Sequence, residues 1–166
     1  MVEYTEKLLQ FIKENDIDAE LVHSEALVDH KDNVLEAIKN MNIKFEDIVK
    51  TIIFYDQDKP LVEGNAVVAI VPAESRVDRL KVKKLCGSRI KIAGAEDVLK
   101  LTGYPAGGVP PFGFKAKWYI DKSLIDKKGT IYAGGGSLNK LLKTRVSEIV
   151  KINTPVIEDI IEKIES

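Results

Sequence analysis

The sequence predicts a single domain of mixed α/β architecture. Segments whose apolar residues repeat at helical spacing alternate along the chain with short segments rich in β-branched residues. The 166 residues suffice for one full domain and are short for two. No internal repeat and no linker interrupts the pattern, so we expect one folding unit over residues 1–166.

The first half of the chain contains five expected elements. Apolar residues at helical spacing, such as Leu8 and Ile12, indicate helices, and runs of β-branched residues indicate strands. We expect helices over 4–15 and 31–40 and strands over 19–23, 49–55 and 66–71. The last segment is nearly all apolar, which predicts a strand that is buried on both faces.

The second half of the chain combines short strands with helices that end at glycines. Gly87 and Gly103 each follow an amphipathic segment and predict the end of a helix. We expect helices over 77–86 and 95–101, a helical turn over 146–150, a terminal helix over 155–164, and strands over 89–93, 117–121, 130–133 and 137–143. Thr154 and Pro155 suit the N-cap and the first turn of that terminal helix.

The composition argues against a membrane or secreted protein. No run of about 18 apolar residues is present, so we expect no membrane span. The N-terminal residues have neither the basic nor the apolar region of a signal peptide. The single cysteine, Cys86, cannot form an internal disulfide, which is typical of a reducing compartment. We therefore expect a cytoplasmic protein.

Basic residues gather in the middle of the chain. Residues 1–65 contain 15 acidic and 7 basic residues, whereas residues 66–151 contain 7 acidic and 17 basic residues. The densest block runs from Arg76 to Lys91, and Asp78 is its only acidic residue. This asymmetry suits a polyanionic partner, and a solvated helix face is the alternative. The candidate contacts are Arg76, Arg79, Lys83 and Lys84.

Motifs for metal, thiol or serine chemistry are missing from the sequence. There is no CxxC or HExxH motif, and His23 and His30 are isolated, so we expect neither a metal nor a cofactor. Cys86 lies near the end of an amphipathic helix, where a packed thiol is favoured over a nucleophile. Neither a G-x-S-x-G elbow nor a Walker A motif occurs, which argues against acyl-serine chemistry and nucleotide hydrolysis.

Lys50 is unusual because it stands in a largely apolar strand. It shares one face of the expected strand with Ile52 and Phe54. An ammonium group on such a face is costly unless it finds a partner or reaches solvent. The residue pattern leaves two interpretations open, a lysine in a functional cleft and a lysine at a strand end that extends outward into water.

Two glycine-rich loops are the other candidate features. Residues 107–113 combine adjacent glycines with two prolines, and residues 134–136 are three successive glycines. Glycines allow close backbone approach to a ligand, and prolines stiffen a loop, so its N–H groups can hold a phosphate or an oxyanion. An ordinary structural turn is the alternative for both loops.

Six segments together carry a resemblance to a known family. They are residues 49–52, 67–72, 78–85, 101–104, 107–113 and 132–136. In order and spacing they resemble the YbaK/EbsC family, which includes the editing insertion of bacterial-type prolyl-tRNA synthetases. The match spans about residues 20–151, and residues 152–166 form an expected helical extension of the same domain.

The resemblance implies a fold, an activity and partners. The fold would be mixed α/β, with helices around a curved, partly barrel-like sheet. The activity would be hydrolysis, in trans, of mischarged aminoacyl-tRNA: tRNA(Pro) carrying alanine or cysteine, or a tRNA carrying serine or threonine. Aminoacyl-tRNA is the implied partner and prolyl-tRNA synthetase a second candidate. A non-catalytic tRNA- or nucleotide-binding module of the same fold is the alternative function.

The resemblance also assigns residues to roles. The catalytic candidates are Lys50, Gly107 and Gly108. The substrate-binding candidates are Thr51, Pro111, Phe112, Gly113, Gly134 and Gly135. Two departures leave the amino acid that is removed unassigned. Pro110 stands where the family often has a small polar residue, and the late glycine loop offers Ser137 but no acidic residue.

Overall fold

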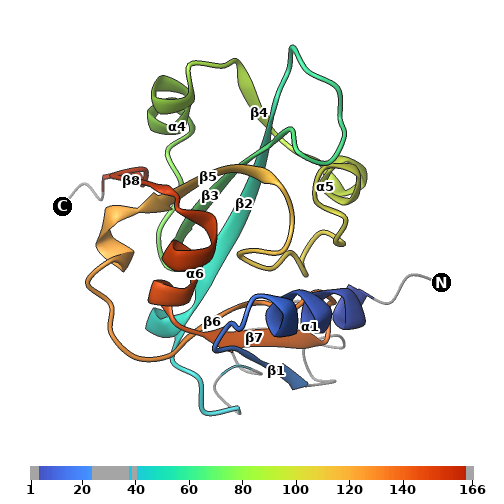
Figure 1. The fold of residues 1–166 in the computed structure, drawn as a ribbon. Helices are drawn as coiled ribbons and strands as arrows, with labels where there is room; N and C mark the ends of the chain where they lie inside the picture. Colours follow the sequence, from blue (N-terminus) through green and yellow to red (C-terminus); the bar gives the residue numbers. More distant parts are fainter. Residues whose placement is uncertain (1–3, 24–37, 39–40, 164–166) are drawn as a thin grey trace.

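Two β-sheets form the frame of the computed structural model, which describes residues 4–23, 38 and 41–163 (Figure 1). The helices are α1 (Tyr4–Glu14), α4 (Arg79–Cys86), α5 (Ala95–Thr102) and α6 (Val146–Asn153), with 3-10 turns η2 (Phe45–Asp47) and η3 (Lys122–Leu124). The strands are β1 (Glu20–His23), β2 (Val49–Asp56), β3 (Ala66–Pro72), β4 (Ile90–Ile92), β5 (Ala116–Asp121), β6 (Ile131–Gly134), β7 (Lys140–Thr144) and β8 (Val156–Glu158).

The larger sheet has five strands in the order β4-β2-β3-β5-β8. Its central strand β3 is buried along almost its whole length, as its apolar sequence predicts. β2 runs antiparallel to both β3 and β4, whereas β5 runs parallel to β3 and to β8. The sheet is therefore mixed, with β2 next to its centre.

The smaller sheet has three antiparallel strands in the order β1-β7-β6. A single bridge between Ile48 and Tyr132 connects β6 to the start of β2. Between the described strands of the two sheets this bridge is the backbone link, and the sheets do not close into a barrel. The expected mixed α/β fold is confirmed. The barrel-like character that was expected of the sheet is limited to this junction between the two sheets.

Apolar side chains form a separate core on each face of the larger sheet. On one face α1, α5, α6 and the smaller sheet bury residues such as Leu8, Leu101 and Ile149. On the other face α4 and the C-terminal segment bury Val82 and Ile160. Asp78 caps α4 by accepting hydrogen bonds from two backbone N–H groups, and Gly87 ends it in the left-handed conformation.

The prediction of a terminal helix over 155–164 is wrong for the described residues. Thr154 does not cap a new helix but ends α6, with a positive φ of 43° and its N–H donated to the Val150 carbonyl. The chain then leaves in an extended conformation, and Val156–Glu158 pairs in parallel with Tyr119–Asp121. The helix expected over 31–40 lies almost wholly outside the described residues.

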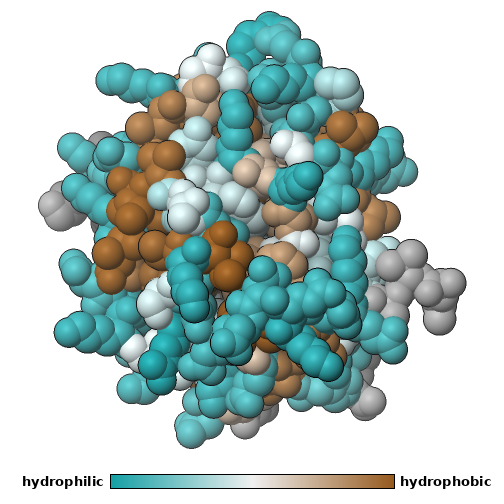
Figure 2. Space-filling model, viewed as in Figure 1, coloured by the Kyte–Doolittle hydropathy of each residue, from teal (hydrophilic) through white to brown (hydrophobic). Residues whose placement is uncertain are grey.

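Apolar side chains also reach the surface around β8. Ile125, Val156 and Ile157 are exposed, and Figure 2 shows apolar surface gathered over this part of the molecule. None of the helices in the described part of the chain has the length and apolar character that crossing a membrane requires.

Candidate functional site

A pocket of about 330 Å³ lies beside β2. Residues from β2, β4, α5, β6 and the first glycine loop line it: Val49, Lys50, Thr51, Ile52, Ile53, Ile92, Ala93, Val98, Ala106, Gly107, Val109 and Gly134. Five of these residues are consecutive in β2, and consecutive strand residues point to opposite faces. The pocket therefore runs along the edge of β2 rather than over one face of the sheet.

This edge of β2 is open because β4 is short. In the described part of the chain β4 pairs with Phe54–Asp56, and the Ala93 N–H donates one further hydrogen bond to the Ile53 carbonyl. The edge is next bridged at Ile48, by Tyr132 of β6, so it is open around Thr51. Backbone groups two residues apart point to the same strand edge, so the N–H and C=O of Thr51 face the pocket. The Thr51 hydroxyl is also buried and has no hydrogen-bond partner within the described part of the chain.

Lys50 lines the pocket next to Thr51 and its ammonium group has a defined partner. Its Nζ donates a hydrogen bond of 2.6 Å to the Ser75 carbonyl, just after the end of β3. Partial burial lowers the pKa of Lys50, and the Arg76 guanidinium nearby lowers it further. An ammonium has three donor hydrogens, so Lys50 can still donate to a ligand while it remains bound to Ser75.

The two glycine loops form the opposite wall because they pack backbone against backbone. The Gly136 N–H donates to the Gly108 carbonyl at 2.7 Å. A Cβ on Gly108 would lie 2.9 Å from the Ser137 backbone nitrogen, and a Cβ on Gly134 would collide with the Val109 carbonyl. Gly107 adopts a φ of 88° and is exposed at the rim of the pocket.

The structure thus places four of the predicted site residues around one pocket, namely Lys50, Thr51, Gly107 and Gly134. Gly108 is buried behind the rim in the contact between the loops. Gly135 contacts the backbone of Lys140 in β7. The structure gives the positions of these six residues but does not test their predicted roles. Those roles therefore stay proposals.

The remaining predicted residues of the first loop lie outside the pocket lining. Phe112 is fully buried in the core and stacks on Phe11, with ring centroids 5.9 Å apart. The Pro111 carbonyl accepts a hydrogen bond from the Asn153 side chain. Gly113 has a φ of 101° and lies beside Tyr104. This part of the loop holds the pocket wall to the core.

The basic candidates lie on and just before α4. Arg76, Arg79, Lys83 and Lys84 are exposed, and none forms an ion pair within the described residues. Two neighbours in sequence differ, because Lys81 pairs with Asp159 and Arg89 pairs with Asp58. Of the four, Arg76 is electrostatically coupled to Lys50.

Sequence reasoning missed the apolar part of the pocket. Its side chains come from four separate segments: Val49, Ile52 and Ile53; Ile92 and Ala93; Val98; and Ala106 and Val109. Nothing in the local pattern distinguishes these residues from ordinary core residues. The one sequence signal for this apolar wall was that Val49, Ile52 and Ile53 are close in sequence to the candidate residues Lys50 and Thr51. In the described ranges no group of three or more His, Cys, Asp or Glu residues is placed to hold a metal ion.

The fold and the pocket define a class of protein: an α/β domain with a largely apolar pocket at a strand edge, one ammonium group in its described lining and packed glycine loops opposite. The family model of the aminoacyl-tRNA editing domain matches residues 28–152, and the chain belongs to this family. The resemblance to YbaK-like editing proteins drawn from the sequence is confirmed.

Relatives and solved structures agree with this assignment. The chain is 28% identical to the uncharacterized protein YwhH of Bacillus subtilis strain 168, over 84% of this chain and 82% of that protein. It is 30% identical to the multifunctional Ser/Thr-tRNA deacylase ProXp-y of Escherichia coli K12, over 57% of this chain and 60% of that protein. The crystal structure of the hypothetical protein APE2540 has a TM-score of 0.75 at 29% identity, covering 94% and 99% of the two chains.

Proposed function

We propose that the protein is a trans-acting deacylase that hydrolyses the ester of a small, uncharged amino acid on a mischarged tRNA. The observation that carries this proposal is the pocket at the open edge of β2. Among the described residues that line it Lys50 alone is charged, and the other side chains are apolar apart from Thr51. A basic aminoacyl side chain would lose its hydration there beside the like charge of Lys50, and a long side chain would exceed the space. The candidate substrates are tRNA(Pro) carrying alanine or cysteine, and a mischarged tRNA carrying serine or threonine.

Positioned donors beside the pocket support hydrolysis without a protein nucleophile. No hydrogen bond from the Gly107 or Val109 N–H to another described residue is present. These groups can hold the attacking water or the oxyanion that forms on the ester carbonyl. Water adds to the carbonyl carbon and the ester C–O bond breaks. The terminal ribose oxygen leaves as a hydroxyl, and the amino acid leaves as its carboxylate.

Lys50 acts in this proposal as an electrostatic and positioning group. Its free donor hydrogens bind a phosphate of the terminal adenosine or the developing negative charge. A general base is not required from the described lining residues, because an aminoacyl ester is activated and its correct placement supplies much of the acceleration. The exposed basic residues of α4 would contact the tRNA backbone. Prolyl-tRNA synthetase, which charges tRNA(Pro), is a candidate protein partner.

A panel of charged tRNAs tests the proposal. We expect the protein to release amino acid faster than buffer from at least one of alanyl- and cysteinyl-tRNA(Pro), seryl-tRNA and threonyl-tRNA. Lys50→Ala should reduce the rate at least about 100-fold, as for loss of an oxyanion-stabilising donor. If binding is measurable but every ester survives as long as in buffer, the protein is instead a non-catalytic tRNA-binding module.

A further inference from the structure

The Lys50 ammonium is held by a loop that has no regular structure of its own. Ser75 lies between the end of β3 and the start of α4, and its carbonyl accepts the hydrogen bond from Lys50. The Ala73 N–H donates to the Ile48 carbonyl and the Ser75 N–H to the Pro72 carbonyl, which fixes the beginning of the loop. The position of the Ser75 carbonyl therefore also depends on what holds residues 76–78.

The C-terminal segment 159–162, called the tail here, holds those three residues. The Glu162 N–H donates to the Arg76 carbonyl at 2.8 Å, and the Asp78 N–H donates to the Ile160 carbonyl at 2.8 Å. Between these bonds, Val77 and Ile161 form an antiparallel bridge. The tail thus pairs with every residue from Arg76 to Asp78, directly after Ser75.

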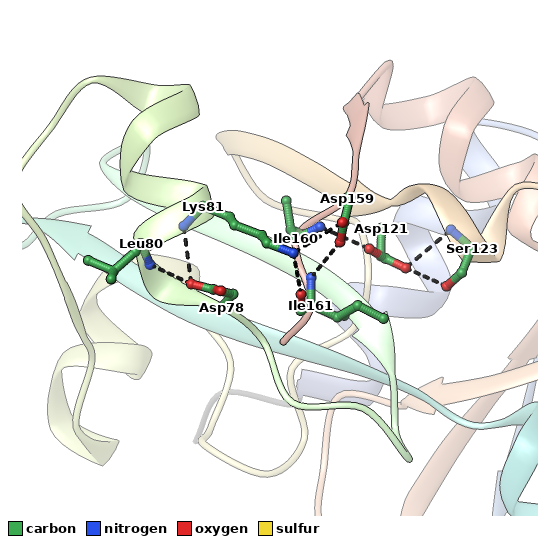
Figure 3. Close-up of polar contacts among 8 residues, drawn as sticks. All are labelled: Asp78, Leu80, Lys81, Asp121, Ser123, Asp159, Ile160 and Ile161. Carbon is green, nitrogen blue, oxygen red and sulfur yellow. Dashed lines mark hydrogen bonds and ion pairs between the residues drawn. The ribbon is translucent and has the colours of Figure 1, made fainter. Parts of the chain in front are cut away.

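The tail is itself anchored to the rest of the molecule (Figure 3). Asp121, only 1% exposed, accepts the Ile160 N–H at 2.9 Å through one carboxylate oxygen, and its other oxygen accepts from Ser123. Lys81 donates to the Ile161 carbonyl at 2.8 Å and pairs with Asp159 at 3.0 Å. A buried carboxylate is costly unless it is hydrogen-bonded, so Asp121 fixes the backbone of the tail firmly.

We propose that the tail positions Lys50 by fixing the Arg76–Asp78 backbone, and with it the Ser75 carbonyl that binds the ammonium group. The tail lies beyond residues 28–152, which the editing-domain family model matches. It therefore adds to the site an element from outside the matched region. Lys50 and Glu162 are 112 positions apart in the chain, yet only the Ser75–Arg76 segment separates their hydrogen bonds. The effect on catalysis rests on the proposed function, whereas the effect on the position of Lys50 does not.

Two substitutions at one exposed residue test this connection. Glu162→Pro removes the N–H that donates to Arg76, whereas Glu162→Ala removes the same side chain and keeps that N–H. We expect Glu162→Pro to lower kcat for the preferred aminoacyl-tRNA about 10-fold with little change in KM, because Lys50 is displaced from its working position. Glu162→Ala should behave like the unmodified protein. Asp159→Ala, which removes the ion pair with Lys81, should shift kcat in the same direction by a smaller factor.

A measurement without substrate separates positioning from the proposed activity. The 13Cε resonance of Lys50, assigned by its absence in Lys50→Arg, is titrated in each variant. We expect its pKa to rise toward the ordinary lysine value in Glu162→Pro, because water reaches the ammonium and Arg76 is released. If thermal unfolding shows a loss of stability while this pKa and kcat match those of Glu162→Ala, the tail is only a structural clamp and the proposal is wrong. If no aminoacyl-tRNA is hydrolysed, the proposed function fails, and the Lys50 titration still decides the positioning.

Discussion

Lys50 is a charged residue in the largely apolar strand β2. It is partly buried beside apolar residues, it keeps a single described protein partner in the Ser75 carbonyl, and it lines the pocket. The residue pattern left open whether such a lysine extends into water or serves a cleft. The Ser75 hydrogen bond shows that the ammonium is held in place rather than extended freely into solvent.

The pH dependence of hydrolysis should report the protonation of Lys50. Burial and Arg76 lower its pKa, so the charged form is lost at a lower pH than for an ordinary lysine. Because the proposal requires the charged form, kcat corrected for spontaneous hydrolysis should fall as the pH rises through that lowered pKa. Stopped-time assays across the alkaline range measure this profile.

Lys50→Arg supplies the control for this profile. A guanidinium remains charged across the whole range, so the alkaline fall should disappear in this variant whatever its residual rate. A fall of the same size and midpoint in Lys50→Arg would assign the titration to another group.

Gly134 is expected to be required by the contact between the two glycine loops. A Cβ at this position would meet the Val109 carbonyl, a backbone atom that cannot turn aside. We expect Gly134→Ala to lower the free energy of unfolding by about 1–3 kcal/mol and to reduce activity, because the wall of the pocket must move. Chemical denaturation and the deacylation assay measure the two effects.

Gly94→Ala is a matched control, because a Cβ there has nothing within 4 Å and the residue has a negative φ. Its cost should be the smaller one of a changed helix N-cap. Equal losses in the two variants would show that the loop contact tolerates a methyl group.

At the scale of the elements, local patterns predicted the structure wherever a local interaction decides it. Runs of β-branched residues predicted β2 and β3 close to their observed bounds. The glycines that end α4 and α5 did the same for these two helices. The region after α6 failed because long-range pairing decides it. Thr154 and Pro155 suit a helix start, but Thr154 takes a left-handed conformation and β8 pairs with β5. Neither the partner strand nor Asp121 is visible in the local sequence.

The candidate site shows the same division. Lys50, Thr51 and the glycine loops carry unusual residue types at fixed spacing, so the sequence singled them out. The apolar wall is formed only when residues from β2, β4, α5 and the first loop meet at the open strand edge. The tail behind Ser75 is invisible for a similar reason, because its hydrogen bonds use backbone groups that every sequence offers.

At the scale of the whole molecule, α4 and α1 cover opposite faces of the larger sheet. α4, which carries exposed basic residues, lies at the upper left of Figure 1, and α1 lies at the lower right, on the opposite side of the larger sheet. Lys81 and Arg89 are engaged in ion pairs, whereas Arg76, Arg79, Lys83 and Lys84 form none with the described residues and can meet a polyanion. Contact with a tRNA backbone through these residues predicts a specific dependence on salt.

Binding of aminoacyl-tRNA should weaken with salt, and α4 should carry part of that dependence. Each phosphate contact changes the slope of log K against log salt by about 1, so Lys83→Ala combined with Lys84→Ala should reduce its magnitude by up to about 2. Lys13→Ala, on the exposed last turn of α1, is the control and should leave the slope unchanged. Binding titrations at several salt concentrations give the three slopes. An α4 variant with an unaltered slope would mean that its basic face is solvated and that the tRNA approaches from another side.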